Sequence, residues 1–253
     1  MMNGNYETQL STHDEESVTI RGKDLTSEIM GELDFGSAFI HLLIGESLTA
    51  KEGRLVNAML SSLMVHGTTP HAIATRLTLL SEPNSTQGAV ASGLLGVGSR
   101  FAGAMEQCAT DLQSINSADD REASVEELVA AYRESGNRFA GIGHPEFDPV
   151  DPRAQRLFEL AEEADVAGEH VAILEDLQSE FEETTGRDLP INVTGAIGAL
   201  TSDLGLEPEA ARGFAIVSRA AGLIAEIIEE KDSPIAMDVW QSVDDEMTYV
   251  EDQ

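Results

Sequence analysis

The sequence predicts an all-α protein of about ten to twelve helices. Two observations support this fold class. Apolar residues recur at helical spacing in one segment after another between residues 33 and 230. Glycine and proline separate these segments, and no run of alternating apolar and polar residues predicts a sheet.

The elements follow one another from a polar N-terminus. Residues 1–22 have no sustained apolar period, so we expect a flexible arm that ends in a short strand near residues 18–20. Thr49 and Glu52 have the spacing of a capping box, which begins a helix. The small residues from Gln87 to Ala109 predict one helix packed closely on its neighbours. Further helices are expected over residues 33–43, 70–80, 124–135, 154–164, 168–185, 192–204 and 208–230.

Charge is the strongest feature of the composition. The 253 residues include 46 acidic and 15 basic side chains, which gives a formal net charge of −31. Such a surface repels itself unless salt screens the charges. We therefore expect a salt-adapted, halophile-type protein, with an ordinary acidic surface as the alternative. A nucleic acid partner is not expected, because phosphates require clustered Lys and Arg.

Hydropathy and cysteine content indicate where the protein is located. The apolar stretch from Phe214 to Ile228 is interrupted by Arg219 and Glu226, and no segment has the roughly 20 apolar residues of a membrane helix. No basic segment followed by an apolar run opens the chain. We expect a cytoplasmic protein with no membrane partner. The single cysteine, Cys108, is expected to be a small buried hydrophobe.

A histidine in a Gly/Pro-rich loop is the first candidate for chemistry. His144 lies within the segment Gly141–Arg153, nine residues before Arg153. Imidazole can donate a hydrogen bond to a developing oxyanion, and guanidinium can bind a carboxylate with two parallel hydrogen bonds. The pattern indicates an anion site, and a surface loop with a chance histidine is the alternative.

Two further features leave alternatives open. The glycine-rich segment Ser92–Gly103 allows close approach of a neighbouring helix or of a flat ligand. His71 lies near His66 and is open to a binding role. These two histidines are five positions apart, off one helical face, so we expect no metal site. The remaining histidines are expected in the arm, in a helix core and at a helix start, at positions 13, 41 and 170.

Four segments, in order, resemble the blocks of citrate synthases over residues 24–245. The resemblance is carried by His66-Gly67, by Gly143-His144 followed by Asp151-Pro152-Arg153, by Leu189–Gly195 and by Phe214–Gly222. Four ordered blocks are more specific than any single motif. The chain therefore resembles the citrate synthase superfamily.

The branch of the superfamily is indicated by two other segments. Gly96–Gly103 resembles the Gly-Asp-Arg-Phe block of citryl-CoA lyases and of the C-terminal module of ATP-citrate lyase, with Ser99 where that block has Asp. The closing segment 240–250 resembles the end of the ATP-citrate lyase module.

The resemblance implies a fold and an assembly. It implies a citrate-synthase-like, large helical domain over 23–104 and 206–253, and a smaller helical domain over 105–205 that closes over the substrate by hinge rotation. It also implies a homodimer with the active site at the interface. Its ligands would be an acyl-CoA thioester and a keto acid, with no permanently bound cofactor.

The resemblance also implies roles for individual residues. His144 would contact the hydroxyl or keto oxygen, His66 would position the substrate, and Arg153 and Arg219 would bind carboxylates. The implied binding set is completed by Ser99, Arg100 and Asn192.

Three positions depart from the family pattern. Thr194 stands where the family has its catalytic Asp, and a threonine hydroxyl is not an acid or base near neutral pH. Pro145 replaces an Arg of the lyase branch, and the partner-donated Arg has no equivalent near residues 233–238. The carboxylates near enough in sequence to carry the proton instead are those of Glu146, Asp148 and Asp151.

The sequence thus gives three hypotheses for function. The first is a citryl-CoA lyase-like enzyme that cleaves citryl-CoA to acetyl-CoA and oxaloacetate. The second is a citrate-synthase-type condensation, or the cleavage of a different hydroxyacyl-CoA. The third is a non-catalytic regulator that binds a CoA metabolite. Turnover separates the first two from the third.

Overall fold

The computed structural model of the protein describes residues 6–147 and 149–251. These residues form eleven α-helices, two π-helical turns and three short strands, which confirms the all-α prediction. The α-helices are α1 (Phe35–Ile44), α2 (Ala50–Ser62), α3 (Pro70–Ser81), α4 (Thr86–Val97), α5 (Gly103–Asn116), α6 (Arg121–Ser135), α7 (Pro152–Glu163), α8 (Glu169–Thr185), α9 (Val193–Asp203), α10 (Pro208–Asp232) and α11 (Ala236–Glu246). In the described part of the chain, no helix is both long and apolar enough to cross a bilayer.

A small antiparallel sheet precedes the helices, and the sequence predicted only one of its strands. The expected strand near residues 18–20 is β2 (Val18–Ile20), which pairs with β1 (Ser11–His13) and β3 (Lys23–Asp24). The other two strands were missed because their residues, Ser-Thr-His and Lys-Asp, are all polar, whereas β2 has two apolar β-branched residues. Arg21 donates to the carbonyl oxygens of Leu42 and Leu43 at 3.1 and 2.9 Å, which holds this sheet against the end of α1.

The capping box predicted at Thr49 and Glu52 is present at the start of α2. The Glu52 amide donates to the Thr49 hydroxyl at 3.3 Å, and the Thr49 amide donates to the Glu52 carboxylate at 2.6 Å. These two bonds satisfy amides that the first helical turn leaves free.

The long helix expected from Gln87 to Ala109 is wrong, because the helix breaks at Gly98. Gly98 has φ +46° and ψ −169°, a conformation that side chains with a Cβ rarely adopt, and the π-helical turn Gly98–Ala102 separates α4 from α5. The expected close packing is nevertheless present. A Cβ on Gly93 would lie 2.1 Å from the Thr75 hydroxyl on α3, so this position accommodates only glycine.

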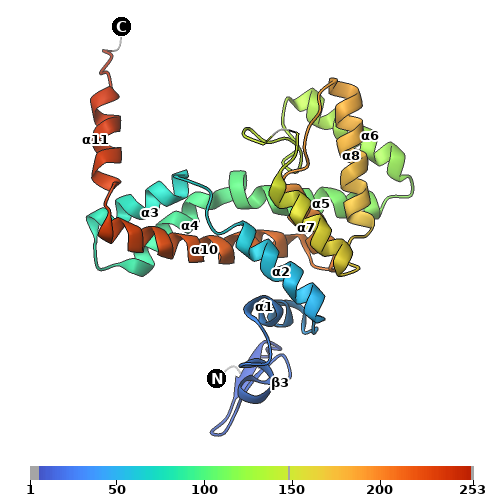
Figure 1. Ribbon diagram of the computed structural model, residues 1–253, viewed down its shortest axis with the longest axis horizontal. Coiled ribbons are helices and arrows are strands. Elements are labelled where there is room, and N and C mark those ends of the chain that lie inside the picture. The colour runs from blue at the N-terminus through green and yellow to red at the C-terminus, as the bar shows by residue number, and fades with distance from the viewer. Residues whose placement is uncertain (1–5, 148, 252–253) are drawn as a thin grey trace.

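Figure 1 shows α3, α4 and α10 lying together in one layer, with α5 continuing from it toward the group formed by α6, α7 and α8. One hydrophobic cluster extends from α1 and α2 through α5 and α9 to α10. α9 is the most deeply buried helix of this cluster, since Ala196, Ile197, Ala199 and Leu200 have no exposed surface. The division into domains 23–104 with 206–253 and 105–205 stays a prediction.

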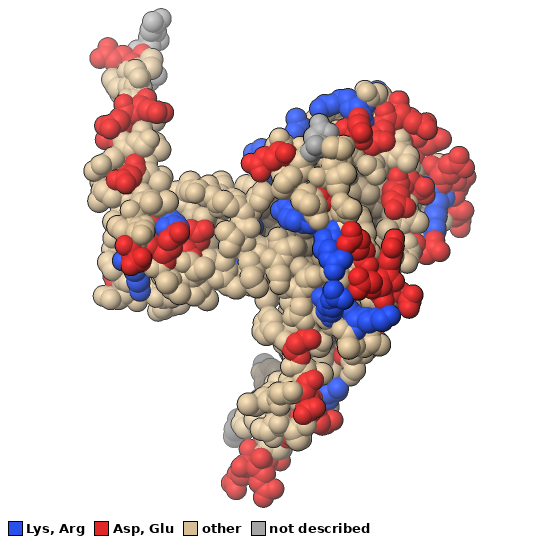
Figure 2. Space-filling model, in the orientation of Figure 1, with Lys and Arg blue, Asp and Glu red and all other residues tan. Residues whose placement is uncertain are grey.

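α11 stands away from the layer (Figure 1), and the sequence did not predict it as a helix. Glu230, near the end of α10, accepts the amides of Ile235 and Ala236, and so fixes the turn into α11. Figure 2 shows acidic side chains on α11, on the α6–α8 group and on the N-terminal sheet, so the negative charge is not confined to one tail.

Candidate active site

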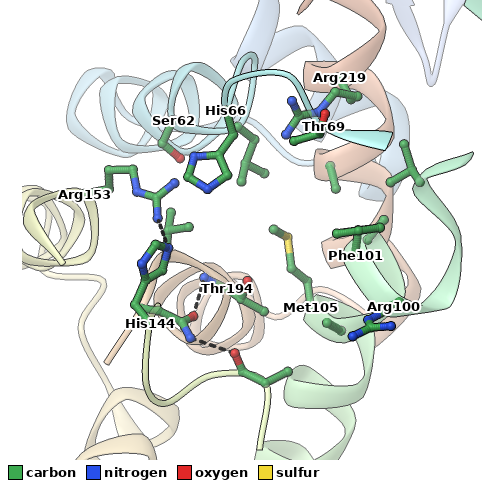
Figure 3. A pocket seen from close by; sticks show the side chains of 18 of the residues that line it. Ser62, His66, Thr69, Arg100, Phe101, Met105, His144, Arg153, Thr194 and Arg219 are labelled. Atoms are coloured by element: carbon green, nitrogen blue, oxygen red, sulfur yellow. Dashed lines mark hydrogen bonds between the residues drawn. The ribbon is translucent and has the colours of Figure 1, made fainter. Parts of the chain in front are cut away.

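The candidate site is a cavity of about 330 Å³ at the junction of α2, α3, α5, α7, α9 and α10. His144, Arg153 and Arg219 all line it, although they are far apart in the sequence. In Figure 3, Arg153 and His144 lie on one side of the cavity and Arg219 on the other. His66, Arg100, Asn192 and Thr194 also belong to its lining. The residues that the sequence predicted for an anion site therefore line one pocket and are not separate surface residues.

His144 is held as a neutral hydrogen-bond donor. Its Nδ1 accepts the backbone amides of Glu146 and Phe147 at 3.1 and 3.2 Å, so the proton of a neutral ring must be on Nε2. Burial, followed by the positive charge of Arg153, lowers the pKa of His144 below the ordinary histidine value. The imidazole therefore stays uncharged at neutral pH.

Arg153 lies beside this imidazole with its own donors. Its Nη2 is 3.3 Å from His144 Nε2, and its guanidinium carbon is 5.1 Å from the centre of the Phe147 ring. With the proton on Nε2, His144 Nε2 and Arg153 Nη2 are both donors. They cannot bond to each other, so the N–H groups that face each other need another acceptor. A ligand oxygen placed between them would satisfy both groups. This geometry suits a carbonyl, an alkoxide or a carboxylate.

Asp151 fixes the position of Arg153 and is not exposed at all. Its carboxylate accepts Arg153 Nε at 3.0 Å and Nη2 at 2.8 Å, and it also accepts the amide of Val193 at 3.0 Å. Burial raises the pKa of Asp151, but the hydrogen bonds from Arg153 and Val193 outweigh it and lower that pKa overall. This carboxylate is a fixed partner of Arg153 and joins the first turns of α7 and α9.

Both polar atoms of the Asn192 side chain make hydrogen bonds to the protein backbone. Its Oδ1 accepts the amides of Thr194 and Gly195, and its Nδ2 donates to the carbonyl oxygens of Ala140 and Gly143 at 2.8 Å each. The residue predicted to bind substrate thus lines the cavity while it holds the loop before His144 against α9.

Thr194, which the resemblance aligns with the Asp of the family pattern, lines the cavity at the first turn of α9 (Figure 3). No Asp or Glu lines the cavity in the part of the chain that the structure describes. Glu146 is exposed and borders a neighbouring cavity, and Asp148 lies outside the described residues. The polar side chains that line the cavity consequently carry imidazole, guanidinium, hydroxyl and amide groups.

Arg219 is half-buried on α10, and burial lowers the pKa of its guanidinium. Within the described residues, no hydrogen bond or ion pair involves its guanidinium. His66 follows α2 and its ring centre is 5.9 Å from that of His144. Arg100 reaches the cavity from the π-helical turn, whereas Ser99 is exposed on the same turn and does not line the cavity.

Comparisons with known proteins identify the family of this chain. Residues 15–236 match the family described as citrate synthase, C-terminal domain. The chain belongs to the citrate synthase family. Citryl-CoA lyase from Hydrogenobacter thermophilus has a structure similar to that of this family member, with a TM-score of 0.87 and 32% identity over 99% of this chain and 96% of the other.

Other relatives are longer than this citrate synthase family member. The beta chain of ATP-citrate synthase from Oryza sativa is 28% identical over 60% of this chain, which spans 27% of that protein's length. ATP citrate lyase from Methanothrix soehngenii, solved with citrate and coenzyme A, has a TM-score of 0.83 and 19% identity, covering all of this chain and 43% of the other. At that identity the likeness shows the fold alone.

A second cavity of about 540 Å³ was missed by the sequence analysis. It shares Gly143, His144 and Pro145 with the first cavity and is lined by Arg133, Arg138 and Arg187, among other residues. Six of the twelve arginines of this acidic family member therefore line the two cavities. The scarcity of basic residues could have revealed this site. In a chain with a net charge of −31, the few arginines are unexpected near one another unless they bind an anion.

Sequence reasoning also missed the side chains that complete the first cavity wall. Phe101 and Met105 line it from the π-helical turn and from α5. His71, which the sequence left open, is buried in the same wall. In the described residues no cluster of three or more His, Cys, Asp or Glu side chains suits a metal ion. Cys108 is buried as expected, and burial raises the pKa of its thiol.

Proposed function

We propose that this member of the citrate synthase family cleaves citryl-CoA to acetyl-CoA and oxaloacetate. The observation that carries the proposal is the junction of the His144 donor with Arg153 and Arg219 in one cavity. The full-length similarity to a citryl-CoA lyase supports the choice of reaction.

The proposed cleavage begins with the substrate oxygen at His144. Nε2–H of His144 and the Arg153 guanidinium donate to oxygens at one end of the substrate, and Arg219 binds a carboxylate at the other. Because His144 Nδ1 already accepts two amides and Nε2 carries the proton, this ring is not free to accept another. We assign the base to His66, whose exposed ring faces His144.

The bond changes then balance. His66 takes the hydroxyl proton, the oxygen forms the ketone of oxaloacetate, and the electrons of the carbon–carbon bond pass into the acetyl-CoA enolate. The enolate carbon takes up a proton, returned from protonated His66 directly or through solvent, to give acetyl-CoA, so that no net proton is released. Thr194 offers no carboxylate for that last step, so its contribution is a separate question for mutation.

The second cavity supports a CoA substrate. Arg133, Arg138 and Arg187 line it directly beside the His144 loop. Guanidinium groups bind phosphates through paired, charge-assisted hydrogen bonds. A CoA ester could place its phosphates there while its acyl group reaches His144. We propose no permanently bound cofactor.

Turnover tests the function directly. Purified protein in about 2 M KCl, where surface repulsion is screened, should release oxaloacetate from citryl-CoA, and malate dehydrogenase coupling makes the release visible. Product from another hydroxyacyl-CoA but not from citryl-CoA would move the assignment to the second hypothesis. Binding of these esters with no product from any of them would overturn the enzyme proposal and favour a regulator.

We also propose that the protein is a homodimer. α10 exposes Ile216, Ile224 and Ile228, and α11 exposes Trp240 and Val243. Large apolar side chains along two helices support a protein interface. Light scattering on the purified chain should give twice the chain mass, and a monomer at all concentrations would contradict the proposal.

We finally propose a cytoplasmic, salt-adapted protein, on the net charge of −31. Raising KCl from about 0.1 to 2 M should raise the melting temperature, because the Debye length shortens. A melting temperature independent of salt would contradict salt adaptation.

A further inference from the structure

His71 is a buried histidine in the wall of the cavity that no part of the proposed cleavage uses. It is the second residue of α3 and is 2% exposed. Its Nε2 lies 2.7 Å from the Thr69 hydroxyl oxygen, and its Nδ1 is buried with no partner among the described residues. Burial, then the charges of Arg219 and His66, lower the pKa of His71 to about 4, so the ring is neutral at physiological pH.

The Thr69 side chain does not cap α3, although Thr69 is the N-cap residue of that helix. It is the N-cap of α3, where a threonine hydroxyl usually accepts an amide of the first turn, but its side chain makes no such bond. The hydroxyl pairs with the His71 ring instead. It also lines the cavity, and in Figure 3 it lies in the same corner as Arg219.

The unpartnered Nδ1 indicates which nitrogen of His71 carries the proton. A neutral imidazole has one N–H and one bare nitrogen. Buried N–H groups without an acceptor are rarer than buried acceptors without a donor. The proton is therefore on Nε2, which donates to the Thr69 oxygen. The hydroxyl hydrogen of Thr69 is then free to point into the cavity.

We propose that His71 is a positioning residue that turns the Thr69 hydroxyl, as a donor, toward the substrate carboxylate bound by Arg219. The inference rests on the proposed function, because it names further groups of that same site. It makes the specificity for a carboxylate at this end of the cavity depend on two neutral groups as well as on one cation.

Paired substitutions test this assignment. Thr69→Val removes the hydroxyl at constant shape, and His71→Phe removes the N–H while keeping a ring against Phe101, whose ring centre is 5.7 Å away. Each should raise the citrate dissociation constant and the citryl-CoA KM about tenfold, with kcat changed much less. The double variant should be no worse than either single one, because both changes remove one hydrogen bond.

Conservative variants and pH separate positioning from a merely structural role. Thr69→Ser and His71→Gln keep a donor in place and should recover most of the loss. The ratio of variant to wild-type KM should stay constant between about pH 6 and 8, since His71 does not titrate there. Should His71→Phe fail to fold, the Thr69→Val and Thr69→Ser pair carries the test alone.

The outcomes for this inference and for the cleavage are distinguishable. Citrate binding that is weakened in Thr69→Val, with no cleavage by the wild type, overturns the cleavage and leaves this inference standing. Cleavage by the wild type with unchanged KM and citrate affinity in Thr69→Val overturns this inference alone. Additive losses in the double variant, or a wild type that binds no carboxylate, also overturn it.

Discussion

Two arginines on neighbouring helices differ in their ion pairs: in the part of the chain that the structure describes, Arg76 on α3 is paired with carboxylates, and Arg219 on α10 is not. Arg76 is 4% exposed, and its guanidinium contacts the carboxylates of Glu226, Glu229 and Glu230, the last at 2.8 Å. Arg219 is half-buried and has no ion pair within the described residues. The pKa of Arg76 is raised by its three partners despite burial, and that of Arg219 is lowered by burial.

The difference separates a structural charge from one reserved for a ligand. A charge removed from water without a partner destabilises the fold, so the unpaired state of Arg219 has a cost that the native packing must offset. The cost is understandable if an anion binds there. Arg76 has no such requirement, because it joins α3 to α10 and, through Glu230, to the start of α11.

The largest expected effect is on the stability of Arg76→Met. This change leaves the buried carboxylate of Glu230 and the mostly buried one of Glu226 without their cation, so we expect a loss of about 3–5 kcal/mol in the free energy of unfolding. Urea unfolding at fixed KCl measures it. Arg219→Met is the matched control and should be as stable as the wild type or slightly more so. Equal destabilisation by both substitutions would break the distinction between the two arginines.

The next effect is on catalysis, at His144. His144→Ala should lower kcat/KM for citryl-CoA by about 10²–10³-fold, because it removes a donor to the reacting oxygen. His144→Asn sharpens the test, since its amide oxygen can still accept the Glu146 and Phe147 amides while Nε2–H is lost. High activity in His144→Asn would mean that the imidazole only holds the loop.

A smaller effect is a shift in pH dependence. His144 acts while neutral and its pKa is lowered, so its own contribution to the acid limb of kcat/KM should lie below the ordinary histidine pKa of about 6.5. Arg153→Gln removes a positive neighbour and should move this limb upward. The pH profile of both proteins measures the shift, and an unmoved limb would show that another group titrates.

The smallest effect is expected at Thr194. Thr194→Ala should lower kcat/KM less than about threefold, because a threonine hydroxyl does not exchange protons near neutral pH. Steady-state kinetics of the variant give the answer. A large loss, with the variant folded, would place the Thr194 hydroxyl in the proton transfer.

The helices and the main site residues were predictable because their signals are local or ordered. The Thr49–Glu52 capping box lies within one turn, and the His144 and Arg153 motif spans one loop and the first turn of α7. The break at Gly98 was not predictable, since Gly93, Gly96 and Gly103 in the same segment all lie within helices. α11 was missed although Met237, Trp240 and Val243 recur at helical spacing.

The structural hydrogen bonds that the site residues make within the fold could not be predicted from the sequence. Asp151 was a candidate proton carrier, and only the fold shows it held by Arg153 and by the amide of Val193, 42 positions away. The bonds of Asn192 to Ala140 and Gly143 are likewise long-range. Sequence patterns identify which groups meet, whereas their hydrogen-bond partners depend on packing.

The most direct measurement is oxaloacetate release from citryl-CoA by the wild type and by Arg219→Met under identical salt. The wild type should turn over, and Arg219→Met should have a kcat/KM about 10–100-fold lower at unchanged stability, since it lacks a charged hydrogen bond to the substrate. No release by the wild type, or equal release by both proteins, would contradict a citryl-CoA site built around the unpaired Arg219.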